Sequence, residues 1–192
     1  MILGPFKGDV KIPGGGSAPC GIDGACLTDC AVLGENLIRN VAVMSKVIVE
    51  RGAVVIGCDI IAGKEGSTFG CGQELPIAIE TGGREVAVFA EITVPVASAV
   101  AGRRAEKDFL KAYGQRVADY AKRAASDFTT LAEGCQVVGT SRVLGSYIGP
   151  GAKVLSARGV HGSTLLSSAG EPAEVLDGAL VKNSILQWGS EA

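Results

Sequence analysis

The sequence predicts a mainly β protein in which short strands wind into a parallel coil, interrupted by an inserted loop and a long α-helix. Two observations lead to this fold class. Aliphatic residues recur at every sixth position from Leu37 onward, and a six-residue repeat broken by turn residues makes short strands that bend at regular corners. The composition agrees, because 28 glycines accompany only 5% aromatic residues, as expected for a core of many small side chains.

The repeat runs in two phases that differ by four residues. The first phase contains Leu37, Val43, Val49, Val55 and Ile61, and the second contains Val41, Val47 and Ala53. With three short strands per coil, we expect a triangular coil of about 18 residues, and stacked coils then bury the aliphatic side chains in a continuous interior. A single coil cannot bury its own apolar face, so the coils stabilise one another.

The repeat stops and returns near the end of the chain. The second block contains Ile148, Ala152, Val154, Val160 and Thr164, and closes with residues 177–185. The turn-rich residues 167–172, Ser-Ser-Ala-Gly-Glu-Pro, predict a loop within this block. Because the last repeat has no obvious polar cap, we expect the chain to be a portion of a longer solenoid.

A segment of different character, from about residue 64 to 133, separates the two repeat blocks. Its first half is irregular and rich in glycine, and residues 85–95 alternate weakly, as in a strand. Its second half predicts a helix over about residues 103–127. The apolar residues at helical spacing are Phe109, Leu110, Tyr113, Val117, Tyr120, Ala121 and Ala124. We therefore interpret residues 1–192 as one domain with an insertion at 64–133, whose helix lies against the coil or a neighbouring subunit. The basic face of this helix is expected to be solvated, and the alternative is that it contacts an anion or a partner.

Charge and cysteine content exclude several classes of function. The 18 Lys and Arg residues against 20 Asp and Glu leave a net charge of −2, so no basic excess favours a nucleic-acid partner. The apolar stretches are too short and too charged to predict a membrane span. No secretory signal is evident, so we expect a cytoplasmic protein. Six cysteines without a CxxC pair and a single histidine argue against a metal site, and we expect free, buried cysteines.

Three segments carry a resemblance to a known superfamily. They are Ser-Thr-Phe-Gly-Cys-Gly-Gln-Glu at 67–74, Glu-Thr-Gly-Gly-Arg-Glu-Val at 80–86 and Asn-Ser-Ile-Leu-Gln-Trp-Gly at 183–189. With the repeats, they resemble the left-handed parallel β-helix (hexapeptide-repeat) superfamily of acyltransferases and of the C-terminal domains of sugar-nucleotide pyrophosphorylases. The order of segments is similar to that of a bacterial hexapeptide-repeat family of unassigned function with a helical insertion. That family has Asn at the position of Cys71 and Asn-Glu-Ala at residues 79–81.

The resemblance implies a trimer with ligand sites between subunits, and it points to His161 as a candidate catalytic residue. In acyltransferases of this superfamily a histidine at a subunit interface is the general base, and imidazole titrates near neutral pH. His161 follows the inward position Val160, so its side chain is expected to point outward. The alternative is a turn histidine that is exposed or hydrogen-bonded.

A second candidate site comprises Gly82, Gly83, Arg84 and Glu85, together with Gln73 and Glu74. The two glycines bring backbone N–H groups close to an anion, and Arg84 adds a forked donor that suits phosphate or carboxylate. The alternative is a structural turn in which Arg84 pairs with Glu85 or Glu80. Cys71, between two glycines, is a further alternative as an exposed nucleophile.

Together these features predict a homotrimeric, transferase-like protein. We expect it to bind a sugar nucleotide or an acyl-CoA type of ligand at the trimer interfaces, with coenzyme A or acetyl-CoA as the possible cofactor. The alternative function is a non-catalytic trimerisation or assembly domain of a larger protein.

Overall fold

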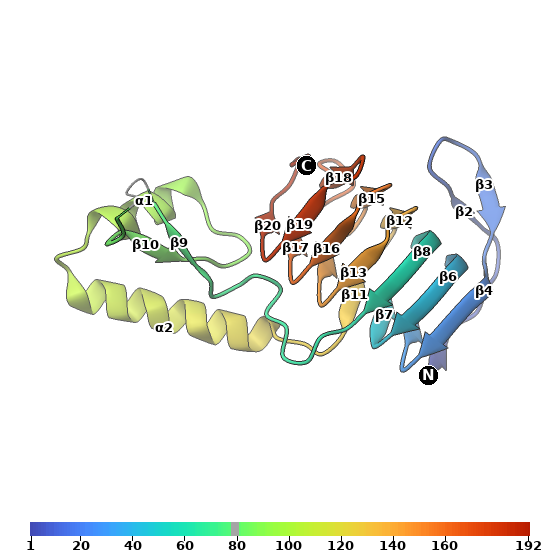
Figure 1. Cartoon of the computed structure of the whole chain (residues 1–192), viewed down its shortest axis with the longest axis horizontal. Helices are drawn as coiled ribbons and strands as arrows, with labels where there is room; N and C mark the ends of the chain where they lie inside the picture. The colour runs from blue at the N-terminus through green and yellow to red at the C-terminus, as the bar shows by residue number, and fades with distance from the viewer. Residues whose placement is uncertain (78–80) are drawn as a thin grey trace.

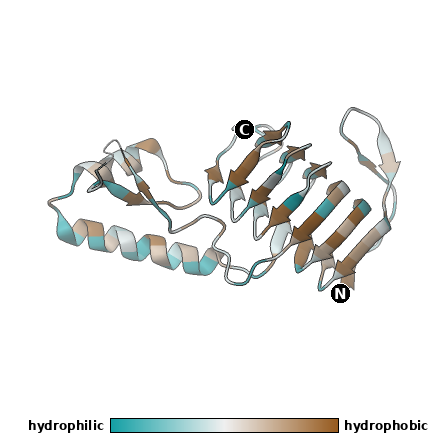
Figure 2. Ribbon diagram, viewed as in Figure 1, coloured by the Kyte–Doolittle hydropathy of each residue, from teal (hydrophilic) through white to brown (hydrophobic). Residues whose placement is uncertain are grey.

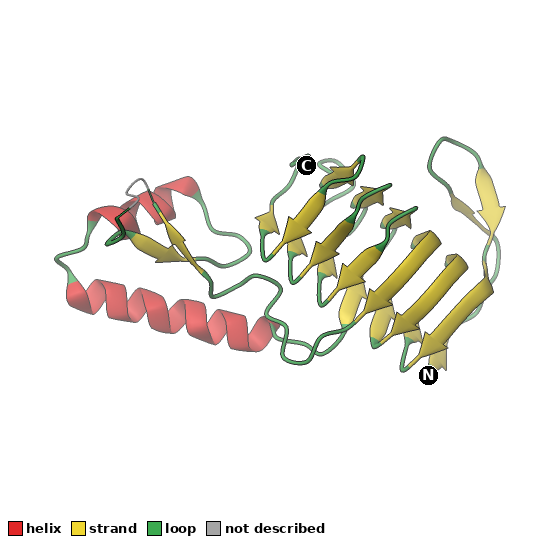
Figure 3. Cartoon of the chain, in the orientation of Figure 1, coloured by secondary structure: helices red, strands yellow, loops and turns green. Residues whose placement is uncertain are grey.

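The chain forms a mainly β, β-helix-like coil of stacked parallel strands, with an insertion beyond the C-terminal coil (Figure 1). The computed structural model describes residues 1–77 and 81–192. The strands follow one another along the long axis of the molecule, and the helices belong to the insertion (Figure 3). The mainly β class and the parallel pairing predicted from the sequence are confirmed.

Within the described residues the coil strands form three parallel ladders. The first ladder comprises β4 (Gly21–Thr28), β6 (Leu37–Ser45), β8 (Val54–Ala62), β12 (Gln136–Val138), β15 (Lys153–Leu155) and β18 (Glu174–Leu176). The second comprises the later halves of β4, β6 and β8, then β13 (Arg142–Leu144), β16 (Gly159–His161) and β19 (Leu180–Lys182). The third comprises β1 (Ile2–Leu3), β5 (Ala31–Val32), β7 (Val47–Val49), β11 (Thr129–Leu131), β14 (Tyr147–Ile148), β17 (Thr164–Leu165) and β20 (Ile185–Leu186).

Each regular coil takes 17 residues rather than 18. Leu37 pairs with Val54, and Gln136 pairs with Lys153. The inward residues Ile38, Met44 and Val49 explain the difference. Six residues separate Ile38 from Met44, but only five separate Met44 from Val49. The first phase predicted Val43 as an interior residue, but Val43 is 43% exposed and the next residue, Met44, points inward. Val49, Val55 and Ile61 of the same phase are interior as predicted.

Single residues in the left-handed backbone region close the first two corners of each coil. Examples are Asn40, with φ 54°, and Gly57, with φ 63°, between the first and second ladders. Gly145 and Gly162 occupy the corner between the second and third ladders, with φ 52° and 56°. Such a residue turns the chain sharply and places inward side chains three residues apart, where a strand would place them two apart.

Hydroxyl groups stack at the second corner, where Thr129, Ser146 and Ser163 are buried and Ser184, in the last coil, is half-buried. The Ser146 N–H donates to Thr129 Oγ1 at 3.2 Å, the Ser163 N–H to Ser146 Oγ at 3.2 Å and the Ser184 N–H to Ser163 Oγ at 3.1 Å. Each serine hydroxyl in turn donates to the carbonyl two residues earlier. This hydroxyl ladder (Thr129, Ser146, Ser163 and Ser184) gives its buried polar groups partners inside the apolar coil.

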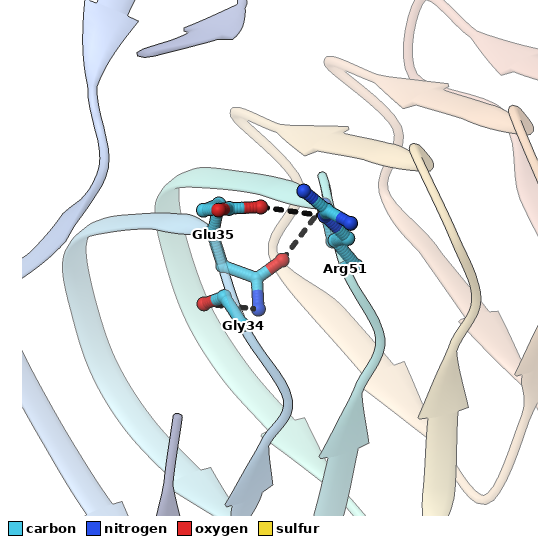
Figure 4. Close-up of polar contacts among 5 residues, drawn as sticks. Gly34, Glu35 and Arg51 are labelled. Carbon is cyan, nitrogen blue, oxygen red and sulfur yellow. Dashed lines mark hydrogen bonds and ion pairs between the residues drawn. The ribbon is translucent and has the colours of Figure 1, made fainter. Parts of the chain in front are cut away.

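Asn36 performs a similar role at the third corner. Its side chain is buried, its Oδ1 accepts the Ala53 N–H at 2.8 Å and its Nδ2 donates to the Gly34 carbonyl. Beside it Arg51 pairs with Glu35 at the surface (Figure 4). The amide thus ties one coil to the next from inside, while the ion pair ties them from outside.

An N-terminal hairpin covers the outer face of the first ladder. Strands β2 (Asp9–Lys11) and β3 (Ser17–Pro19) pair antiparallel, and Val10 packs against Leu37 and Val54. Leu37 is therefore buried under the hairpin and does not point into the coil interior.

Elsewhere the interior columns are mainly aliphatic, with the small side chains of Cys30, Cys58 and Cys135 among them. Ile148, Ala152, Val154 and Val160 are buried in the coil, as the spacing predicts. Thr164 is also buried, but it points out of the coil, where its hydroxyl donates to the Phe69 carbonyl at 2.7 Å. Figure 2 shows the hydrophobic strands of the coil beside the more hydrophilic helix α2. The predicted loop at 167–172 contains no strand, and it lengthens the last coil.

The insertion contains a short hairpin and two helices. Strands β9 (Glu74–Pro76) and β10 (Glu85–Ala87) pair antiparallel, and helices α1 (Val94–Gly102) and α2 (Lys107–Ala124) follow. The strand expected at residues 85–95 thus ends at Ala87, and the helix expected at 103–127 begins at Lys107. Pro95 opens α1, where a proline loses no helical hydrogen bond. Among the described residues, neither helix is long and apolar enough to cross a membrane.

Residues 63–73 link β8 to β9 and so lead from the coil into the insertion. This link runs along the corner of the hydroxyl ladder towards the C-terminal end of the coil (Figure 1). Ser67 Oγ donates to the Gly145 carbonyl at 2.6 Å. A Cβ on Gly145 would lie 2.6 Å from Lys64 Cβ, so only glycine lets the link pass this closely. At the far end Gln187 Nε2 donates to the carbonyls of Ala90 and Ile92. The insertion is therefore fixed to the coil at two places: through Ser67 in the link, and through Ala90 and Ile92 beside Gln187.

Candidate functional site

An outer cleft on the second ladder contains His161. The cleft has a volume of about 350 Å³ and is lined by Asp59, Ser141, Arg142, Arg158, His161, Leu180 and Lys182. His161 ends β16, with Leu144 and Lys182 as its register partners on the neighbouring strands. Its side chain points outward, because Val160 occupies the inward position.

Gly159 makes room for the imidazole. A Cβ on Gly159 would lie 2.8 Å from His161 Nε2, so the ring rests over the glycine. Nε2 is buried there and has no hydrogen-bond partner among the described residues. A buried polar atom without a partner costs about 1–3 kcal/mol. The unpartnered Nε2 is therefore an unfavourable feature of the folded chain.

The cleft is rich in cations that have no acidic partner. Arg142, Arg158 and Lys182 line it, and none of them forms an ion pair within the described part of the chain. Asp59 is the acidic lining residue. Some cations elsewhere on the coil are paired, for example Lys153 with Glu174 at 2.6 Å and Arg51 with Glu35. Three cations and one carboxylate, that of Asp59, therefore give the described lining a net positive charge, which favours anions.

Burial and the neighbouring cations act together on His161. Desolvation lowers the pKa of the imidazole below its ordinary value, and the positive charges of Lys182 and Arg142 lower it further. His161 is consequently neutral at pH 7. Chemically, the cleft combines donors for phosphate or carboxylate groups with a neutral imidazole that can accept a proton.

Residues 82–85 lie in the turn that leads into β10. Within this turn the carboxylate of Glu85 accepts a hydrogen bond from the backbone of Gly83. The Gly83 N–H donates to Glu85 Oε1 at 2.8 Å. This hydrogen bond lowers the pKa of the Glu85 carboxyl, and the N–H of Glu85 itself and Arg104 lower it further. Glu85 thus holds the position that an external anion would need.

Arg84 is exposed at this turn. Glu85 contacts Arg104 at 3.8 Å instead of Arg84, and Glu80, the other partner considered for Arg84, lies outside the described residues. Gln73 lines a different cavity at the C-terminal end of the coil, and Glu74 is exposed on β9. None of these residues lines the cleft of His161.

Cys71 is buried against Ala90 and Ala121. Burial raises the pKa of its thiol, which disfavours the nucleophilic thiolate. All six cysteines are free, and Cys30, Cys58 and Cys135 lie in the coil interior. The expectation that all are buried is wrong for Cys26, which is exposed, and for Cys20, which is half-buried. In the part of the chain that the structure describes, no group of His, Cys, Asp and Glu side chains is arranged to hold a metal ion.

Sequence reasoning missed the cations of the cleft. Arg142 stands 17 residues before Gly159, and His161 stands 21 before Lys182, so these residues share the outer face only when the coil length and the loop at 167–172 are known. The six-residue reading did not align these positions. An apolar repeat of 17 residues instead of 18 would have placed Arg142 beside Gly159 of β16.

The site therefore belongs to a β-helix-like protein with a cationic outer cleft and a helical insertion. The whole chain, residues 1–192, matches the family model described as Domain of unknown function (DUF4954), and the chain belongs to this family. Comparison with the curated proteins gives no match, and comparison with the solved structures gives none either.

Proposed function

We propose that the protein is a left-handed hexapeptide-repeat, transferase-type protein that binds a phosphate-bearing ligand in the cleft of His161. The ligand class is a nucleotide sugar or an acyl-coenzyme A. The observation that carries this proposal is the cluster of Arg142, Arg158 and Lys182 without acidic partners beside an imidazole with an unpartnered nitrogen. The hexapeptide-type spacing and the three signature segments support the left-handed sense.

The cations suit the diphosphate that both ligand classes share. Arginine offers forked donors to phosphate oxygens, and lysine adds a point charge. Because Arg142 and Lys182 lie on β13 and β19, the two strands that flank β16, the donors are held on a rigid surface. Binding a polyanion there relieves the repulsion among the cations and needs no rearrangement of the strands.

His161 is the proposed general base in acyl transfer. Its neutral imidazole takes the proton of an acceptor hydroxyl or amine while the acceptor oxygen or nitrogen forms a bond to the thioester carbonyl carbon. As the carbon–sulfur bond breaks, the same proton passes to the leaving thiolate of coenzyme A. The lowered pKa of His161 keeps this base unprotonated at neutral pH.

We also propose a homotrimer in which the outer face bearing His161 lies towards a neighbouring subunit. The outward position of His161 on a flat parallel ladder supports this arrangement, since ligands of the superfamily lie between subunits. Analytical ultracentrifugation of the purified chain tests it directly, with a trimer expected and a monomer contradicting it.

Thermal unfolding with added ligand tests the binding proposal. Coenzyme A, acetyl-CoA and a panel of nucleotide sugars are each added to the wild-type protein, to Arg142→Gln and to Arg123→Gln. Arg123 is an exposed cation of α2 and provides the matched control. Ligand at 100 times its Kd adds about 2.7 kcal/mol of stability, so a clear rise in Tm is expected for wild type and Arg123→Gln, and a much smaller one for Arg142→Gln.

Transfer activity tests the role of His161. Release of free thiol from acetyl-CoA is followed with a panel of amino sugars, and His161→Gln is expected to lower kcat by about 100-fold or more while Kd changes little. Equal activity in both proteins contradicts the base assignment. A folded trimer that responds to none of these ligands contradicts the binding proposal and favours the assembly function.

A further inference from the structure

A second cavity lies where the insertion meets the end of the coil. It has a volume of about 490 Å³, within the usual range for small-molecule sites. One wall comes from β10 and α1, through residues such as Val86, Val88 and Ala97, and the opposite wall comes from the last coil corner, through Asn183 and Ile185. The cavity thus exists only because the insertion is held against the coil, chiefly by Gln187.

The described lining of this cavity carries no charge. Apolar side chains dominate it, and its polar members are amides and hydroxyls, among them Gln73, Asn183, Ser184 and Ser190. This differs from the cleft of His161, in which arginine, lysine and aspartate gather. A charged ligand group would lose its hydration in the cavity without gaining a counter-ion, which is costly. An uncharged ligand group loses less and can hydrogen-bond to the amides.

The rim of the cavity is also apolar. Leu75 is 46% exposed and Val94 is 83% exposed, and both line the cavity. Water-exposed aliphatic side chains at the mouth of a concave apolar site favour a ligand that continues the apolar surface outward. Val94 stands at the first position of α1, one residue after the N-cap Thr93, so its backbone is held by the helix.

We propose that this cavity binds an uncharged amphiphile: a small molecule with an aliphatic chain and a neutral hydrogen-bonding head such as an amide or alcohol. The chain lies along Val86, Val88 and Ile92, and the head reaches the amide groups of Gln73 or Asn183. This site is separate from the His161 cleft in residues and in ligand chemistry, so it does not depend on the proposed transferase function.

Isothermal titration with three ligands of equal chain length tests the proposal. Octanamide, octanoate and octylammonium share the chain and differ in the charge of the head. We expect octanamide to bind the wild-type protein at least tenfold more tightly than either charged ligand. Absence of octanamide binding, or equal affinity for all three, overturns the proposal.

Two pairs of variants localise the site. Ala97→Phe fills the cavity and is expected to weaken octanamide binding at least tenfold, whereas Ser98→Phe, on the exposed side of α1, leaves it unchanged. Val94→Lys adds a cation at the rim without disturbing packing and is expected to raise the affinity for octanoate, whereas Val96→Lys, which does not line the cavity, is not. Unchanged ligand preference in Val94→Lys overturns the placement, even if Ala97→Phe fails to fold.

Discussion

The interior of the coil and the outer cleft are formed by the same strands, but they differ in whether their polar groups have hydrogen-bond or ion-pair partners. Inside, the buried hydroxyls of Thr129, Ser146 and Ser163 each donate and accept a hydrogen bond. Outside, His161 Nε2 is buried without a partner, and Arg142 and Lys182 face no paired acid. The polar groups of the hydroxyl ladder are satisfied within the chain, whereas the polar side chains of the cleft have no partner among the described residues. That difference identifies the cleft as the candidate site.

The largest expected effect separates the two faces of a single strand. Ile61 of β8 is fully buried in the interior, whereas its neighbour Ile60 points outward and is half-buried. Ile61→Ala is expected to cost about 2–5 kcal/mol through lost burial and a cavity, and Ile60→Ala about 1 kcal/mol. Denaturant unfolding of both variants measures this. Equal losses would show that the assigned faces are wrong.

Removal of one hydroxyl tests the completeness of the interior. Ser163→Ala leaves the Ser184 N–H without its acceptor, so the free energy of unfolding is expected to fall by about 1–3 kcal/mol. Ser98→Ala, on the exposed side of α1, is the matched control and is expected to change it by less than about 0.5 kcal/mol. A loss no larger than that of the control argues against a structural role for the ladder.

Paired and unpaired lysines sharpen the contrast at the surface. Lys153 contacts Glu174, whereas Lys182 faces Arg142 and His161. Lys153→Met is expected to lower the free energy of unfolding by about 0.2–1 kcal/mol, and Lys182→Met is expected to leave it unchanged or raise it, because repulsion is removed. Urea unfolding at low ionic strength, where charge effects are least screened, distinguishes the two. Equal destabilisation contradicts the unpaired state of Lys182.

The smallest expected effect is a pH dependence of stability. The pKa of His161 is lower in the folded protein than in the unfolded chain, so below the ordinary histidine pKa the unfolded state binds more protons. The contribution of His161 to stability is therefore complete above that pKa and declines as pH falls through it towards the folded pKa. Between pH 5 and pH 8, the free energy of unfolding should change less with pH in His161→Gln than in the wild-type protein. An identical pH dependence in the two proteins would contradict this coupling.

Much of the coil could be predicted from the sequence because aliphatic spacing is a local property. Val49, Val55 and Ile61 are interior as the repeat indicates. The error at Val43 arose because one interval in each coil is five residues, which depends on corner residues such as Lys46 in the left-handed region, with φ 51°. A non-glycine residue in that region leaves no clear sequence signal.

The candidate site was less predictable because it depends on register. His161 was identified as an outward histidine, but Arg142 and Lys182 come from other coils, and their alignment with it follows from the 17-residue period and the long loop. The turn at Gly82 and Gly83 has the backbone geometry that the sequence indicates, with φ 84° and 96°. Its anion is the side chain of Glu85, which sequence alone does not reveal.

The measurement that tests the central claim most directly is an NMR pH titration of His161, which is the only histidine in the sequence. The imidazole signals give its pKa in the free protein and after addition of inorganic pyrophosphate. The account predicts a pKa below the ordinary histidine value in the free protein and a rise when the anion binds between Arg142 and Lys182. An ordinary pKa that pyrophosphate does not change would contradict both the incomplete cleft and the anion site.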